Sequence, residues 1–131
     1  MKSWSFSWLV LVALALAASS MQATGNAPKY DKTTEVTISG VITAVKDYQC
    51  PISGTMGAHI TIKPETGPEI EVHVAATKYV KDYEMVFATG DKVNVVGSKV
   101  KFNGVDIIIA RELTHGQDTY TFRDKEGKPV W

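Results

Sequence analysis

The sequence has a single cysteine and no surplus of charge of either sign. The first shortage excludes an internal disulfide, and the second argues against nucleic acid as the ligand. Cys50 has no second cysteine with which to form an internal disulfide, so an apolar core must hold the fold together. A lone thiol of this kind is buried, paired between chains or used as a ligand. The chain has 14 basic and 14 acidic residues. Nucleic-acid binding draws most of its affinity from Lys and Arg, so nucleic acid is a poor candidate ligand.

The sequence also lacks a catalytic motif. Ser53 or Cys50 as a nucleophile would need a base, an orienting group and an oxyanion site, and no G-x-S-x-G elbow is present. Glu69 and Glu71 are paired carboxylates, but they flank strand positions that look solvated. We therefore predict that the protein is not an enzyme and has no catalytic residues.

The first twenty residues have the three parts of a secretory signal peptide. Lys2 precedes an apolar run over residues 6–18, and small residues follow. The run is shorter than the roughly 20 apolar residues that cross a bilayer, which makes a retained anchor the weaker alternative. We predict a signal peptide at residues 1–20, cleaved between residues 18 and 23. Without Lys2, 13 basic and 14 acidic residues remain, a formal charge of −1. The mature protein is then periplasmic or secreted, with no membrane span.

The rest of the chain divides into a linker and one domain. Residues 21–33 are polar and broken by Gly25 and Pro28, so we predict a flexible linker there. Residues 34–131 are enough for a single core. Alternating apolar residues predict strands in this domain, and a helical spacing at residues 75–87 predicts a short helix with Thr77 as its N-cap. The predicted strands cover residues 35–45, 58–63, 69–74 and 119–123, with two more within residues 90–112.

Turn and bulge signals define the architecture. Asn103-Gly104 tolerates positive φ at both positions, which predicts a tight hairpin between the two strands of residues 90–112. Gly97 and Gly40 lie where a long strand would bulge to round a barrel corner. Five strands with one helix between the third and fourth is the order of the OB-fold. We predict an all-β fold with one short helix, an OB-fold-like five-stranded Greek-key barrel plus a C-terminal strand. A β-sandwich is the alternative.

Several phrases of the sequence are shared with a known group of proteins: GAHITI, EIEVHVA, GDKVNVVGSKVKFNG, IIIARE and TFRDKEGKPVW. Through them the chain resembles small exported bacterial proteins with OB-like barrels, over most of its exported part. The resemblance implies an OB-like fold and a place in the cell envelope, and it implies no particular activity. Members are often labelled nucleic-acid-binding by fold alone, but a fold does not fix a function.

Polar side chains gather on one face of the hairpin predicted at residues 58–74. A symmetric pairing across its five-residue loop puts Thr61 opposite Glu71 and His59 opposite His73. The Cβ atoms of the two histidines would then be roughly 5 Å apart. OB-folds bind their ligands on this outer face and through the loop between the first two strands. The sequence therefore predicts a binding face on this hairpin.

The loop predicted at residues 47–57 adds Tyr48 and Cys50 to this face. Two imidazoles and a thiolate suit copper or zinc, so Cys50, His59 and His73 form a candidate metal site. Three scattered ligands lack the tight spacing of a zinc motif. In the alternative interpretation, both histidines are partly exposed and bonded to neighbouring polar side chains, and Cys50 is a small buried apolar residue.

We predict a non-enzymatic exported binding module of the cell envelope, whose partner is a small ligand or an envelope protein and which needs no cofactor. One alternative is copper or zinc binding through the candidate metal site. Another is a platform for a protein partner or single-stranded nucleic acid. The predicted ligand-binding residues are Tyr48, His59, Thr61, Glu71 and His73. We also expect surface ion pairs among Arg111, Glu112, Arg123 and Asp124, and we expect Val130 and Trp131 to pack on the domain.

Overall fold

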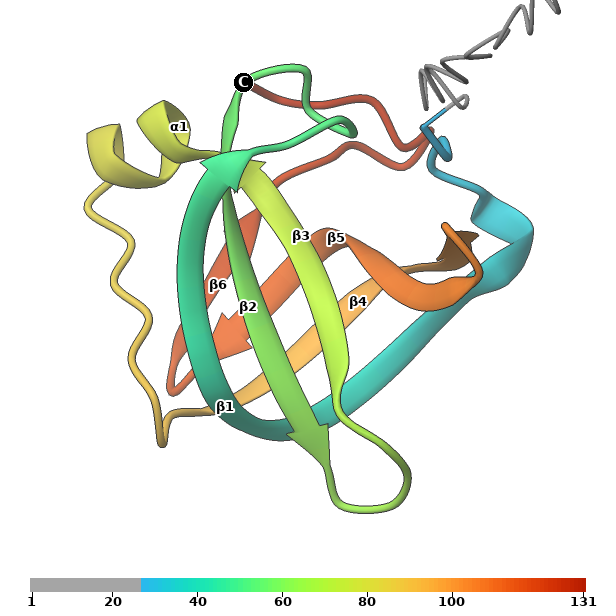
Figure 1. Ribbon diagram of the computed structural model, residues 1–131. Coiled ribbons are helices and arrows are strands. Elements are labelled where there is room, and N and C mark those ends of the chain that lie inside the picture. The colour runs from blue at the N-terminus through green and yellow to red at the C-terminus, as the bar shows by residue number, and fades with distance from the viewer. Residues whose placement is uncertain (1–26) are drawn as a thin grey trace, which may run out of the picture.

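The computed structural model describes residues 27–131, which form a closed β-barrel (Figure 1). The predicted signal peptide and its cleavage positions lie outside the described residues. None of the helices in residues 27–131 has the length and apolar character needed to cross a membrane. The elements are the 3-10 helix η1 (Lys32–Thr34), β1 (Glu35–Gln49), β2 (Met56–Pro64), β3 (Ile70–Ala76), α1 (Thr77–Asp82), β4 (Lys92–Phe102), β5 (Val105–His115) and β6 (Asp118–Thr121).

The long strand β1 organises the barrel. Its first half pairs with β4 and its second half with β2, and a parallel pairing of β3 with β5 closes the sheet. The strand order β3-β2-β1-β4-β5, with α1 between β3 and β4, is the Greek-key arrangement of the OB-fold. Strand β6 pairs with β5 as an addition to the barrel. The predicted OB-fold-like barrel with an extra C-terminal strand is therefore confirmed.

Glycines allow the long strands to curve. A Cβ atom at Gly40 or at Gly97 would lie 2.4 Å from a backbone oxygen of the neighbouring strand, so neither position can hold a side chain without a shift. The pairing register shifts beside Gly97 and two residues beyond Gly40, which confirms the predicted bulges. Asn103 and Gly104 have φ values of 50° and 78°, as the predicted tight turn requires.

The barrel interior is apolar and accounts for the stability of a domain without disulfides. The inner face of the β2–β3 hairpin supplies Ile60, Ile62, Val72 and Val74, each at most 1% exposed. Burying such a side chain contributes about 1.5–3 kcal/mol. Successive side chains of a strand point to opposite faces, so the residues between these four lie on the outer wall. The predicted alternation of this hairpin is confirmed.

The loop between β1 and β2 is shorter than the sequence indicates. Strand β1 continues to Gln49 and β2 begins at Met56, so only residues 50–55 of the loop predicted at residues 47–57 are irregular. The side chains at the end of β1 have partners outside the barrel: the Thr77 hydroxyl donates to Asp47, and Tyr48 stacks on His59. Because of these contacts, the strand continues past residue 45, where the alternation of apolar residues ends.

Helix α1 is also shorter than predicted, and the assignment of Thr77 as its N-cap is wrong. The helix begins at Thr77 itself, and no side chain caps it. Glu84, with φ at 54°, ends the helical path, and the backbone of Met85 bonds to Val80 so that Met85 is buried in the core. Tyr83, expected on the buried stripe, is 66% exposed.

The segments at both ends of the described chain lie against the barrel. Within residues 27–33, the part of the predicted linker that is described, the Tyr30 hydroxyl donates to Glu35. At the other end, Trp131 packs against Tyr79 as expected, whereas Val130 is 47% exposed. The C-terminal segment therefore returns to the barrel through its last residue.

The expected ion pairs among the last strands are only partly present. Arg111 pairs with Glu112 and, more closely, with Glu35 of β1. Arg123 has no carboxylate partner among residues 27–131 and is buried, so its assignment to a surface ion pair is wrong. Asp124 instead accepts backbone N–H groups of the turn that follows it. The reason is that the chain turns back after Phe122 and covers the Arg123 side chain.

Candidate metal centre

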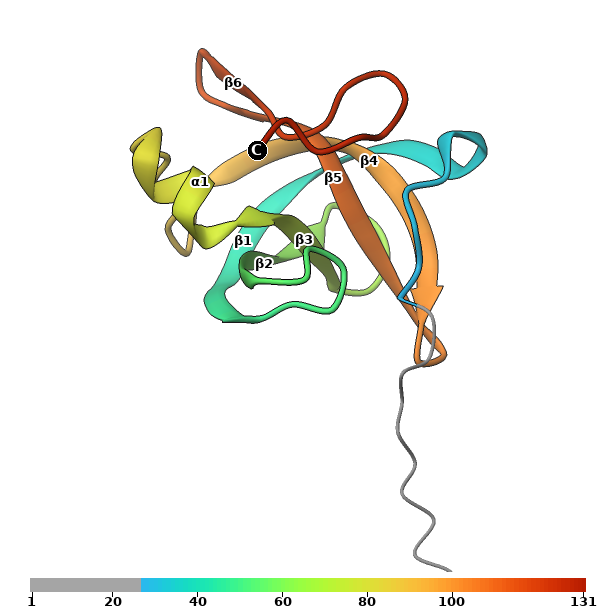
Figure 2. The same ribbon diagram turned by 90° about the horizontal axis from the view of Figure 1, so that it is seen from above.

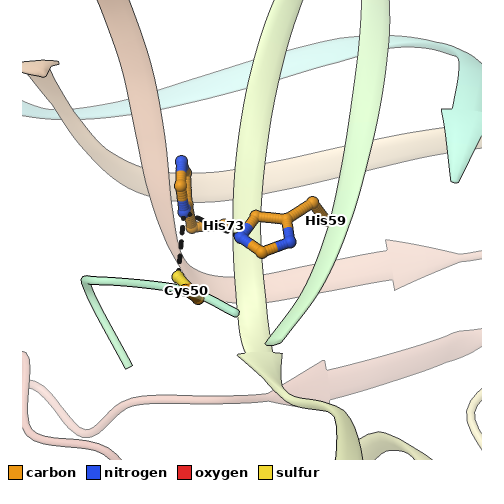
Figure 3. Close-up of side chains that lie close together, drawn as sticks. All are labelled: Cys50, His59 and His73. Atoms are coloured by element: carbon orange, nitrogen blue, oxygen red, sulfur yellow. Dashed lines mark hydrogen bonds between the residues drawn. The ribbon is translucent and has the colours of Figure 1, made fainter. Parts of the chain in front are cut away.

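Cys50, His59 and His73 meet on the outer wall of the β2–β3 hairpin (Figure 3). The two histidines are opposite one another in the ladder, as are Thr61 and Glu71, so the predicted hairpin register is confirmed. Cys50 is the first residue after β1, and the loop that follows brings its sulfur over β3. Three residues separated by 9 and 14 positions in the sequence therefore share one site.

The donor atoms of this cluster are close enough to share an ion. Nε2 of His59 lies 3.0 Å from Nδ1 of His73, and Sγ of Cys50 lies 3.3 Å from the same nitrogen. All three ligand atoms lie within 4.8 Å of one another. The imidazole planes are nearly perpendicular, with an interplanar angle of 86°. Both rings thus direct a nitrogen toward the same point.

The cluster is buried, which corrects the expectation of partly exposed histidines on an open outer face. His59 is 1% exposed, Cys50 2% and His73 5%. The loop of residues 50–55 lies over one end of the hairpin, and the C-terminal segment passes beside it (Figures 1 and 2). Cys50, His73, Arg123 and Trp131 line one small cavity between these segments. The sequence pattern could not reveal this cover, because it comes from irregular segments.

Local sequence explains why the loop fits closely over the histidines. A Cβ atom at Gly57 would lie 2.8 Å from Cβ of Cys50 and 3.3 Å from the His59 ring, so only glycine leaves room for both. The N–H of Cys50 donates to Thr55, and its carbonyl accepts from Gly54, which has a φ of 72°. Both backbone groups of Cys50 are therefore bonded within a loop of six residues.

The cluster does not satisfy its own hydrogen-bonding groups. Within the described chain, Nδ1 of His59 and Nε2 of His73 are buried without a partner. If His59 donates to His73, then His73 carries its own proton on the unpartnered Nε2. If His73 donates to His59, then His59 carries its proton on the unpartnered Nδ1. Either arrangement of two neutral rings leaves one buried N–H without an acceptor, which costs about 1–3 kcal/mol.

Burial keeps both imidazoles neutral. Desolvation, with a smaller contribution from the neighbouring His59, lowers the pKa of His73 to about 4. Desolvation also lowers the pKa of His59, although the Glu71 carboxylate and the backbone carbonyls of Gly57 and Lys46 act in the opposite direction. A neutral imidazole has a free lone pair, which is the form that binds metals. The site is therefore prepared for a cation at neutral pH.

Tyr48 and Glu71 support His59 from the side. The Tyr48 ring stacks on the His59 ring at a centroid distance of 3.7 Å and an interplanar angle of 8°. Its hydroxyl donates to the Glu71 carboxylate, and burial together with this bond raises the pKa of Tyr48. The stack fixes the plane of the His59 ring. Of the other predicted ligand-binding residues, Thr61 lies opposite Glu71 in the ladder, two residues along β2 from His59.

Arg123 lies in the wall of the Cys50 cavity, although the sequence predicted it only in a surface ion pair. It is 7% exposed, its Nη1 donates to the carbonyl of Gly127, and its guanidinium carbon lies 5.1 Å from the Trp131 ring centroid. Its Nε has no partner among residues 27–131. The one available signal was the terminal tryptophan, which needs a cover and stacks well on Arg. A buried cation therefore borders the Cys50 cavity.

The spacing of the three donors suits a transition metal. Zinc bonds of about 2.0–2.1 Å to nitrogen and 2.3 Å to sulfur place two nitrogens roughly 3.3 Å apart and nitrogen and sulfur roughly 3.5 Å apart at tetrahedral angles. Two of the three separations, at 3.0 and 3.3 Å, are a few tenths of an ångström shorter, and the third is within 4.8 Å. Small rotations of the side chains would therefore admit an ion. A larger groove of about 660 Å³ lies elsewhere, beside Pro64 and Lys101, and contains none of the predicted site residues.

The fold and the site together define an OB-fold protein with a buried Cys-His-His cluster on the outer wall of its β2–β3 hairpin. The model of the MamS/MamX magnetosome protein family matches residues 34–120, and the chain belongs to this family. The match covers the barrel and most of β6. It gives the predicted group of OB-like proteins a specific family.

Solved structures with a similar fold have low sequence identity. One is the Stn1-Ten1 complex of S. pombe, with 20% identity, a TM-score of 0.48 and coverage of 64% of this chain. Another is the N-terminal domain of the PriB protein from Thermoanaerobacter tencongensis, with 17% identity, a TM-score of 0.49 and coverage of 63% of this chain and 96% of that one. This chain spans 59% of the matched Stn1-Ten1 chain. No curated protein matches the sequence.

Proposed function

We propose that this protein is a non-enzymatic metal-binding module that holds one copper or zinc ion on Cys50, His59 and His73. The observation that carries the proposal is the convergence of three buried donor atoms within 4.8 Å of one another. A thiolate and two imidazoles are ligands of intermediate softness, which suit copper and zinc better than magnesium or calcium. The ion would replace the unsatisfactory contact between two neutral imidazoles.

The surroundings of the three ligands support this proposal. Metal-binding imidazoles are usually held by partners of the ring or of its second nitrogen. The Tyr48 stack holds His59, and the backbone carbonyls of Gly57 and Lys46 act on the same ring. Small rotations on metal binding would give the His59 Nδ1–H an acceptor among these carbonyls.

The place of action is also a proposal. The family is a magnetosome family, and the leader expected at residues 1–20 would carry the chain out of the cytoplasm. We propose that the module works in the cell envelope or in the magnetosome compartment.

The other predicted functions have less support from the geometry. A platform for single-stranded nucleic acid needs free aromatic rings on its binding face. Tyr48, the aromatic residue predicted for that role, uses its ring against His59. A small organic ligand on the outer face would have to displace the loop of residues 50–55, which covers the histidines.

Metal analysis tests the proposal directly. The protein is purified from the cell envelope and also loaded separately with Cu(I), Zn(II) and Fe(II), and bound metal is measured per chain. We expect one equivalent of copper or zinc in the wild type. We expect less than a tenth of an equivalent in the His59→Ala, His73→Ala double variant and in Cys50→Ser, because each leaves fewer than three ligands.

His115 provides a matched control. It is the third histidine of the chain, it lies on β5 beside Asp91, and it is remote from the cluster in the fold. The His115→Ala variant should keep the full equivalent of metal. A wild type that takes up neither copper nor zinc would refute the proposal, and so would equal metal content in the double variant and the wild type.

A further inference from the structure

The charges around the cluster distinguish between ions of different valence. Resting on the metal-binding function proposed above, we infer that the site is selective for monovalent copper over divalent ions, and that Arg123 determines this selectivity. The inference combines two observations: a buried guanidinium without a carboxylate partner in the described chain, and its position in the wall of the Cys50 cavity.

Arg123 is held in place by contacts that leave its charge uncompensated. Its Nη1 bonds to the neutral carbonyl of Gly127, and its guanidinium faces the Trp131 ring. Desolvation lowers the pKa of Arg123, and the opposing influences come from Cys50 and Tyr30, neither of which is a carboxylate. A Cys50 thiolate would place a negative charge in the same small cavity as this cation.

The sum of charges favours a monovalent ion. Arg123 contributes +1 and the Cys50 thiolate −1, and the two imidazoles are neutral. Glu71, which faces His59 and accepts from Tyr48, contributes −1. With Cu(I) the sum is zero, and with Zn(II) or Fe(II) it is +1. The exposed Asp47 also faces His59, but water screens its charge. Uncompensated charge in a buried site is costly, so the divalent ions are disfavoured.

The number of ligands agrees with this choice. Three donors form the cluster, and soft thiolate ligands favour Cu(I). Zinc sites need a fourth ligand, commonly water in an open position. The three residues are at most 5% exposed, and the cavity beside Cys50 is bordered by the Arg123 cation. Binding replaces the Cys50 S–H bond by a sulfur–copper bond, and the proton is released to water.

Competition between ions tests the inference. The full chain is titrated with Cu(I) against bicinchoninate and with Zn(II) against a chromophoric zinc chelator, and the ratio of the Zn(II) Kd to the Cu(I) Kd is measured. The wild type should bind Cu(I) more tightly. In Arg123→Met the ratio should fall about tenfold, because a divalent ion feels one more unit of repulsion from the Arg123 charge than a monovalent ion does.

Charge is separated from packing by further variants. Arg123→Met keeps an aliphatic stem against Trp131, and Arg123→Gln serves as a second neutral variant if Met misfolds. Arg123→Lys keeps the charge and should keep the ratio within threefold of wild type, as should Arg111→Gln, because the Arg111 side chain is paired with Glu35 and Glu112. Any effect on deprotonation of Cys50 applies to both ions and cancels in the ratio.

The outcomes are distinguishable. A tenfold fall in the neutral variants with little change in Arg123→Lys supports the inference. An unchanged ratio in the neutral variants overturns it, as does a wild type that prefers Zn(II), and both results leave the metal-binding function intact. A wild type that binds neither ion refutes the metal-binding function and this inference with it.

Discussion

Two polar clusters lie on the outside of this barrel, and they differ in whether their hydrogen bonds are complete. Around Arg111, Nε and Nη2 both donate to Glu35, Nη1 donates to Glu112, and the Tyr30 hydroxyl donates to the second oxygen of Glu35. Around His73, Sγ of Cys50 and Nε2 of His59 both lie within hydrogen-bonding distance of Nδ1, and the other nitrogen of each histidine has no partner in the described chain.

The difference indicates what each cluster does. Buried polar groups in proteins are almost always hydrogen-bonded, and an exception needs an explanation. The Arg111 cluster needs none, because its guanidinium is paired with two carboxylates and the cluster joins the N-terminal segment to β5. The Cys50 cluster is more deeply buried and less satisfied, so it lowers the stability of the metal-free protein. An ion held by the three converging ligand atoms is the simplest explanation for the presence of this cluster.

The largest effect that would separate the two clusters is the response of the metal-free protein to acid. The pKa of His73 is lowered to about 4 from an ordinary value of 6.5. Between these values the unfolded chain binds a proton that the folded chain does not, so stability is full above pH 6.5 and falls as the pH decreases toward 4. We expect a loss of roughly 3 kcal/mol, measured by urea unfolding at pH 7, 5.5 and 4.

A variant without the histidines isolates this effect. His59→Leu, His73→Leu replaces both rings by apolar groups, so it should lack this loss and, in the absence of metal, be as stable as wild type at pH 7. Acid loss from carboxylates is common to both proteins and cancels in the difference. Parallel pH curves for the variant and the wild type would contradict the burial of neutral imidazoles as the cause.

The next effect concerns the fit of the loop over the cluster. In Gly57→Ala the new methyl group would contact Cβ of Cys50 at 2.8 Å and must displace the loop. We expect metal affinity to fall by about 10–100-fold, as for other changes that disturb the support of metal ligands. Gly54→Ala, where nothing lies within 4 Å, is the control for loop substitution, although its positive φ makes it mildly strained. Equal affinity in Gly57→Ala and wild type would show that Cys50 is not a ligand.

Most of the barrel could be predicted from the sequence because it depends on local patterns. Alternation of apolar residues located the strands, and Asn103-Gly104 and Gly97 located the turn and a bulge. The patterns failed where tertiary contacts decide the structure. Stacking of Tyr48 on His59 extends β1 past its alternation, and burial of Met85 ends α1 early.

The residues that form the site could be predicted from the sequence, but their burial could not. The symmetric hairpin placed His59 opposite His73, because register in a short hairpin follows from loop length. The depth of burial could not be predicted, since it comes from the loop of residues 50–55 and from the C-terminal segment, which follow no periodic pattern. For the same reason Arg123, next to a buried Phe122, was expected on the surface.

The smallest of the three effects tests the satisfied cluster. In Arg111→Met, Glu35 loses two charge-assisted hydrogen bonds but keeps Tyr30, and both side chains are partly exposed, so we expect a loss of about 1–2 kcal/mol at pH 7 with metal affinity unchanged. The hydrogen bonds from Arg111 lower the pKa of Glu35. The stabilisation is therefore present above pH 4.5 and disappears as the pH falls through the folded-state pKa.

Urea unfolding at pH 7 and pH 3 measures the difference, and Lys78→Met, at the exposed pair with Asp82, should show no measurable change. An Arg111→Met deficit that did not shrink between pH 7 and pH 3 would mean that Arg111 stabilises the fold by packing rather than by charge. The contrast between the two clusters would then rest on burial alone.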